Sequence, residues 1–171
     1  SDLLGADNAL DHIATEIPLR TLTISETGTT GMYGPFQHAR SKLFLALISI
    51  GYTLKAEGSG GSYGYGKAGL IAGSATRTVV AYTCFRERPD DPGVTRRLLG
   101  MTYWGQHVLG EQSFTGFARL GREAGGWVEP FENEQADEVA VSLGLKVRSE
   151  GDLDDLGTTF LLVDAEVEPK D

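Results

Sequence analysis

Disulfide partners and long apolar runs are missing from this chain. Its 171 residues include a single cysteine, Cys84, which cannot form a disulfide within the chain and lies in an apolar segment where burial is expected. No apolar run approaches the ~20 residues that cross a bilayer, and the amino-terminal residues do not resemble a signal peptide. We therefore expect a cytoplasmic protein in a reducing environment, with no membrane partner.

Residue patterns typical of metal and nucleophilic centres are also missing. His12, His38 and His107 lie far apart in the sequence and lack the spacing of metal ligands. The acidic residues within 152–155 lack the glycine and distal glutamate of a calcium loop, so we interpret them as a solvated turn. No Ser-His-Asp or Cys-His arrangement can be identified.

Positive charge is scarce. The chain has 15 Lys and Arg residues against 24 Asp and Glu residues, which leaves a formal net charge of −9. A surface of this charge repels phosphate backbones, so the sequence does not indicate a nucleic-acid partner. The length and the hydrophobic content of 40% suit one ordinary globular domain.

The apolar periodicity mixes helices with hairpin-connected strands. Amphipathic spacing predicts helices at 7–16, 37–50 and 132–143 and the start of a helix at 67–74. Alternating or β-branched runs predict strands at 19–25, 76–85, 97–104, 145–148 and 157–165, and segment 114–130 receives no assignment. This order indicates an α+β class, with a two-layer sandwich of a mixed, mostly antiparallel sheet and helices on one face.

The glycine-rich segment 58–70, GSGGSYGYGKAGL, is the strongest local signal. Glycine at this density lets backbone N–H groups approach a ligand closely, and a helix start favours an anion such as phosphate. A flexible linker is the alternative, but linkers do not usually contain two tyrosines and run directly into an apolar segment. The segment therefore predicts nucleotide binding.

A phosphate-binding P-loop is one way to use this segment. Gly61, four intervening residues, Gly66 and Lys67 fit its spacing. The next position should be Ser or Thr to hold Mg²⁺, and here it is Ala68, while no buried strand is predicted before the loop. A P-loop-like NTPase stays open as the less favoured alternative.

Two further motifs accompany the glycine-rich segment. The predicted strand at 19–25 leads into ETGTTGM at 26–32, and Gly-Thr at 157–158 opens the last predicted strand. The ordered set resembles the GHKL ATPases, which share the Bergerat ATP-binding fold and include type II topoisomerases, MutL proteins, histidine kinases and heat-shock chaperone ATPases. The resemblance covers roughly residues 19–165 and implies a single ATP-binding domain over 1–171.

The resemblance implies a role for each motif residue. Glu26, where the family usually has Asp, would accept a hydrogen bond from the adenine amino group, and Thr158 would support that carboxylate, often through water. The turn at 29–30 is one residue longer than the usual pattern. Gly28 and Gly31 would let the backbone pass close to the base, and Met32 would pack against the base. The lid and the residues that face the phosphates would be Gly58, Gly60, Gly61, Tyr63, Gly64, Tyr65, Gly66 and Lys67.

The catalytic helix of this family is the part that the sequence does not supply. That helix carries a Glu that activates water and, four residues later, an Asn that binds Mg²⁺. Asn8 is the candidate metal ligand, but Leu4 stands where the Glu belongs, and a polar residue on a short helix is the simpler interpretation. Either that helix belongs to sequence outside this chain, or the domain is a degenerate, non-hydrolysing interaction module. The family resemblance also implies that the domain binds ATP and Mg²⁺ as cofactors. It further implies that closure of the lid over ATP is coupled to homodimerisation.

Overall fold

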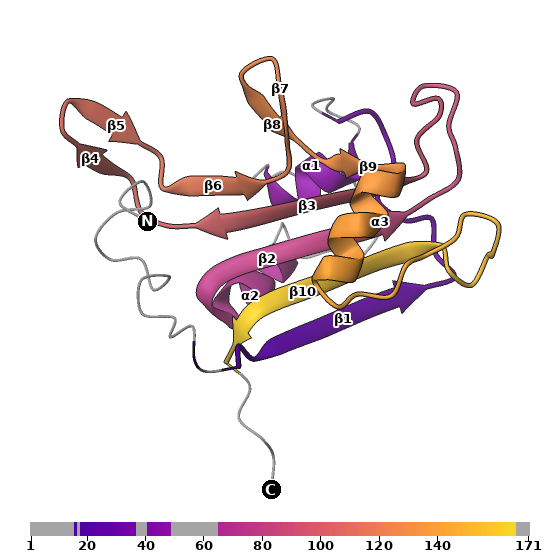
Figure 1. Ribbon diagram of the computed structural model, residues 1–171, viewed down its shortest axis with the longest axis horizontal. Coiled ribbons are helices and arrows are strands. Elements are labelled where there is room, and N and C mark those ends of the chain that lie inside the picture. Colours follow the sequence, from indigo (N-terminus) through magenta and orange to yellow (C-terminus); the bar gives the residue numbers. More distant parts are fainter. Residues whose placement is uncertain (1–15, 17, 37–40, 49–64, 167–171) are drawn as a thin grey trace, which may run out of the picture.

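A computed structural model describes residues 16, 18–36, 41–48 and 65–166. These residues form ten strands and three helices, with the loops between them (Figure 1). In chain order the elements are β1 (Thr21–Thr27), α1 (Lys42–Leu47), α2 (Tyr65–Ala72), β2 (Ser74–Cys84), β3 (Arg96–Tyr103), β4 (His107–Leu109), β5 (Gln112–Phe114), β6 (Phe117–Leu120), β7 (Arg122–Ala124), β8 (Trp127–Glu129), β9 (Phe131–Glu132), α3 (Asn133–Ser142) and β10 (Gly157–Ala165). No helix among these residues is long and apolar enough to span a membrane.

A six-stranded sheet organises the fold. Its strand order is β1-β10-β2-β3-β6, with β9 paired to β3, and every strand pair of the described residues is antiparallel. β2 and β10 form its centre, while β1 lies at one edge with most of its side chains exposed. Two hairpins, β4–β5 and β7–β8, extend away from the sheet near β6 (Figure 1). The predicted α+β class is therefore confirmed, with a strand-rich, antiparallel character.

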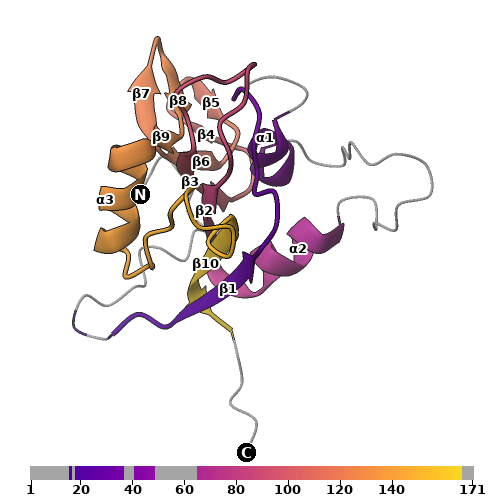
Figure 2. The same ribbon diagram turned by 90° about the vertical axis from the view of Figure 1, so that its right-hand side faces the viewer.

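Helices lie on both faces of the sheet, so the predicted arrangement with helices on one face is wrong. Val79 and Ala81 of β2 pack in the cluster that includes α1, whereas Val80 and Tyr82 pack against α3. Seen along the sheet, α3 lies on one side and α1 and α2 lie on the other (Figure 2). The cause is that β2 and β3 are apolar on both faces, and each apolar face requires a covering layer.

Most predicted strands and helices match observed ones. The strands predicted at 19–25, 76–85, 97–104 and 157–165 correspond to β1, β2, β3 and β10, and the helix predicted at 132–143 is α3. The predictions at 37–50 and 67–74 correspond to α1 and α2 over the described residues. The helix predicted at 7–16 lies outside the described residues, apart from residue 16.

The strand predicted at 145–148 is wrong. This segment follows α3 without regular structure, and its side chains anchor it instead of a strand ladder. Leu145 is buried in the cluster beneath α3, and the Arg148 backbone N–H donates to the Tyr82 hydroxyl at 3.2 Å. The Arg148 guanidinium is buried as well and donates to the Thr159 hydroxyl at 2.8 Å.

A buried ion-pair network connects the loop that follows β1 to the sheet. Arg97 of β3 is 3% exposed and donates to both carboxylate oxygens of Asp91, at 2.7 and 2.8 Å. It also donates to Glu132 at 2.8 Å and to the Gly34 carbonyl at 2.7 Å. Burial alone would lower the pKa of Arg97, but these carboxylates raise it, so the guanidinium stays charged.

Removal of the Arg97 guanidinium should destabilise the fold. In Arg97→Met the buried carboxylate of Asp91 loses its counter-charge, which typically costs about 3–5 kcal/mol. Urea denaturation measures the free energy of unfolding. The control is Lys146→Ala, which removes the ion pair of an exposed lysine with Asp155 and should change that free energy far less. Equal effects of the two substitutions would contradict the structural role of the network.

Three buried groups with ionisable protons make the stability of the core depend on pH. Burial raises the pKa of the Cys84 thiol to about 11 and that of the Tyr103 phenol to about 12. Burial also raises the pKa of Tyr82, assisted by its hydrogen bond to Asp137 at 2.6 Å. In the unfolded chain these groups ionise near their ordinary values of 9.0 and 10.0, so above pH 9 the unfolded state has released protons that the folded state keeps.

The fold should therefore lose stability at alkaline pH. Because the unfolded state is favoured as pH rises above 9, the free energy of unfolding should fall by up to about 1.4 kcal/mol per pH unit for each of these groups. Urea denaturation at a series of pH values up to 11 measures the slope. Cys84→Ala removes one ionising group and should make the slope above pH 9 shallower; an unchanged slope would contradict the shifted thiol pKa.

Candidate functional site

Three polar side chains lie in a row across the end of the sheet. Glu26 of β1 pairs with Thr158 of β10, which in turn pairs with Thr83 of β2. Residues directly opposite one another in an antiparallel pair share a face. Ala81 and Phe160, two residues away on these strands, pack in the cluster with α1 and α2. The row therefore lies on the α1 and α2 face. It joins the first motif in chain order, ETGTTGM at 26–32, to the third, Gly-Thr at 157–158.

The Thr83 hydroxyl is the junction between these motifs. It accepts a hydrogen bond from the Met32 backbone N–H at 2.7 Å and lies 3.0 Å from the Thr158 hydroxyl. It donates a hydrogen bond to the Gly157 carbonyl, with 3.1 Å between the two oxygen atoms. Thr83 and Thr158 are both fully buried. The sequence prediction missed Thr83, although a hydroxyl within the apolar run 79–85 is the signal that could have found it.

The two glycines of the first motif have different structural roles. Gly31 has φ of +61°, and a Cβ atom there would collide with the Cys84 carbonyl oxygen. Gly28 has φ of +66° but open space around its Cα atom. Only glycine lets the loop pass this close to β2, and this close passage brings the Met32 N–H to the Thr83 hydroxyl.

The backbone around Glu26 is fixed, while its carboxylate faces solvent. The Glu26 carbonyl accepts a hydrogen bond from Arg148 Nη2 at 2.9 Å, and a Cβ atom on Gly157 would collide with this same carbonyl. The Glu26 side chain is exposed, and one carboxylate oxygen accepts a hydrogen bond from the Thr29 hydroxyl at 3.2 Å. The Thr29 hydroxyl thus orients the Glu26 carboxylate.

The described end of the glycine-rich motif, residues 65–70, belongs to α2, which packs on the same face. This helix begins at Tyr65, and its residues Leu70 and Ile71 pack in the cluster with α1. Gly66 and Lys67 also belong to its first turn. Five other predicted lid and phosphate residues and the predicted metal ligand lie outside the described residues: Gly58, Gly60, Gly61, Tyr63, Gly64 and Asn8.

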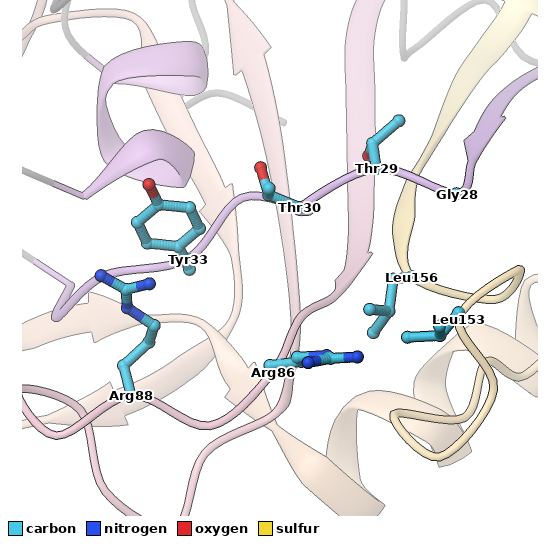
Figure 3. A pocket seen from close by; sticks show the side chains of 8 residues that line it. All are labelled: Gly28, Thr29, Thr30, Tyr33, Arg86, Arg88, Leu153 and Leu156. Atoms are coloured by element: carbon cyan, nitrogen blue, oxygen red, sulfur yellow. The ribbon is translucent and has the colours of Figure 1, made fainter.

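A cavity of about 470 Å³ lies beside the first motif (Figure 3). Its lining comes from three segments that are distant in sequence, namely Gly28, Thr29, Thr30, Tyr33, Arg86, Arg88, Leu153 and Leu156. Gly28 is the sequence-predicted site residue that contributes to it. Glu26 does not line the cavity and is connected to it through Thr29.

Two further observations bear on the site. Within the described part of the chain, no group of three or more His, Cys, Asp or Glu side chains could hold a metal ion. Comparisons with protein-family models, curated proteins and solved structures find no match to this chain. The geometry of the motifs is therefore the basis on which a function can be proposed.

The different surroundings of the two glycines predict unequal effects of alanine. Gly28→Ala should cost about 1 kcal/mol, because only the left-handed backbone is strained. Gly31→Ala should cost a further 1–3 kcal/mol or so, because its Cβ atom pushes the loop away from Cys84 and lengthens the Met32 to Thr83 bond. Urea denaturation of both variants provides the comparison, and equal losses would contradict the close approach at Gly31.

Proposed function

We propose that this chain is the ATP-binding domain of a GHKL-type ATPase, in which lid closure over the nucleotide drives a larger assembly. The observation that carries the proposal is the meeting of three motifs on one face of the sheet. The Met32 backbone and the Thr158 hydroxyl meet at the Thr83 hydroxyl, and Glu26 lies beside Thr158 on the neighbouring strand. α2, which begins directly after the glycine-rich segment, packs on the same face.

Adenine recognition is assigned to Glu26. An ionised carboxylate only accepts hydrogen bonds, so it selects the amino group of adenine over the carbonyl oxygen of guanine. Its exposure leaves it accessible to a ligand, and the bond from Thr29 limits its freedom. Met32, whose backbone N–H is held by Thr83, packs its side chain against the apolar cluster on the α1 and α2 face. Fixed backbone on both sides means that little reorganisation accompanies binding.

Phosphate binding is assigned to the start of α2 and to the segment before it. The first N–H groups of a helix have no partner within the helix, and the helix dipole favours negative charge there. Gly66 and Lys67 lie in this first turn. Mg²⁺ would accompany the phosphates; Asn8, its proposed ligand, lies outside the described residues. Homodimerisation on lid closure in the cytoplasm belongs to the same proposal.

Two alternatives differ from this proposal in observable ways. A degenerate, non-hydrolysing module is favoured by Leu4, which replaces the expected catalytic Glu. It would bind ATP without turnover, so a phosphate-release assay distinguishes it from an ATPase. A P-loop NTPase is disfavoured because such folds use parallel strands, whereas every pair in the described sheet is antiparallel.

Calorimetric titration with a non-hydrolysable ATP analogue and Mg²⁺ tests the nucleotide site. We expect the unmodified chain to bind the ATP analogue at least tenfold or so more tightly than the matching GTP analogue. Glu26→Ala should weaken binding of the ATP analogue by about tenfold or more, because a hydrogen bond to a charged acceptor is lost. It should also remove the preference for adenine.

The matched control is Glu138→Ala, which removes an exposed carboxylate on α3, on the opposite face of the sheet. It should leave the affinity for the ATP analogue unchanged. Lack of binding by the unmodified chain would defeat the proposal. Binding that survives Glu26→Ala without loss would instead point to a site that does not use this carboxylate, such as a P-loop.

A further inference from the structure

We infer that the cavity beside Tyr33 is a second binding site, for a small molecule that carries an oxyanion, phosphate or carboxylate, on an apolar body. The cavity holds about 470 Å³, which lies in the range of small-molecule sites. Glu26 does not line it, although the Thr29 that lines it donates a hydrogen bond to the Glu26 carboxylate. The inference does not depend on ATP binding.

Two guanidinium groups give the cavity its charge. Arg86 follows β2, and its guanidinium makes no ion pair or hydrogen bond with any other described residue. Its side chain points toward Leu153 and Leu156 (Figure 3). Arg88 stacks on the Tyr33 ring at 4.5 Å, and its nearest carboxylate, Asp90, lies 3.9 Å away. The planar fork of a guanidinium matches the paired oxygens of phosphate or carboxylate.

A third cation lies next to two of the residues that line the cavity. Lys42 of α1 lies 4.2 Å from the centre of the Tyr33 ring and donates to the Thr30 hydroxyl at 3.0 Å. Tyr33 and Thr30 both line the cavity. Two arginines thus line the cavity and a lysine contacts two of its lining residues, on a chain whose net charge is −9. Such local concentration of the minority charge favours an anionic ligand.

Four neighbouring carboxylates are engaged with other groups. Glu87 accepts a hydrogen bond from the Gly93 N–H at 2.7 Å, and Asp91 pairs with Arg97. On the acidic turn, Asp152 accepts from the Asp154 N–H at 2.9 Å, and Asp155 pairs with Lys146 at 2.7 Å. These contacts leave the Arg86 guanidinium available for an external anion.

The other wall of the cavity is apolar. Leu156 is buried, whereas Leu153 is 57% exposed beside it on the acidic turn. A ligand with an apolar body would cover Leu153 while its anionic group meets Arg86. Free inorganic phosphate would satisfy only the charged half of this lining, which is why a substituted oxyanion fits better.

Titration of the full chain, followed by ¹H–¹⁵N NMR, tests the site with phenyl phosphate, benzoate and the neutral benzyl alcohol. We expect phenyl phosphate, benzoate or both to shift signals of Thr29, Thr30 and Arg86, and to bind about tenfold or more tightly than the alcohol. The better of the two anions identifies the preferred oxyanion. Arg86→Gln should weaken its binding by about tenfold.

Arg122→Gln is the matched control, because Arg122 is a half-exposed arginine on β7 and does not line the cavity. Absence of anion binding, or equal weakening by the two substitutions, would overturn the inference. Displacement of the anion by the ATP analogue, one for one, would also overturn it, because the cavity would then belong to the nucleotide site. Anion binding by a chain that binds no ATP analogue would support the second site while rejecting the proposed ATPase.

Discussion

The close passage of residues 28–34 across the carboxyl end of β2 is the constraint on which the rest of the structure depends. Gly31 lies against the Cys84 carbonyl, the Met32 N–H reaches the Thr83 hydroxyl, and the Gly34 carbonyl receives Arg97. The loop then continues into α1, where the Lys42 N–H donates to the Tyr33 carbonyl at 3.0 Å. The position of this one loop therefore fixes where the proposed adenine site, helix α1 and the cationic cavity lie relative to β2.

The two faces of the sheet have different roles. The α1 and α2 face carries the converging motifs, whereas the α3 face carries a network of hydrogen bonds and ion pairs that holds α3 on the strands. There Asp137 of α3 accepts bonds from the Tyr82 hydroxyl and from Arg96, which also pairs with Glu150. Arg148 connects this network to the edge strand β1, since its backbone N–H donates to the Tyr82 hydroxyl and its guanidinium donates to the Glu26 carbonyl.

Strands and motif spacing could be predicted from the sequence because both depend on local patterns. β-branched and aromatic runs mark β2 and β10, and glycines mark places where the backbone must turn or pass closely. The two-sided sheet was missed, because an apolar run does not reveal how many layers cover it. Thr83 and the cavity were missed because their partners are distant in sequence. The cavity joins segments near residues 30, 87 and 155, which only tertiary packing brings together.

The position of β1 at the edge of the sheet has a consequence for the stability of the proposed site. Among the described strands β1 pairs only with β10, and most of its side chains are exposed, so its detachment uncovers little apolar surface. Strands of this kind open locally at a lower free energy than the core, which would appear as faster amide hydrogen exchange in β1 than in β2. Glu26 thus lies on an edge strand that should open more readily than the centre of the sheet, and any ligand held by its carboxylate would also close that strand onto the sheet.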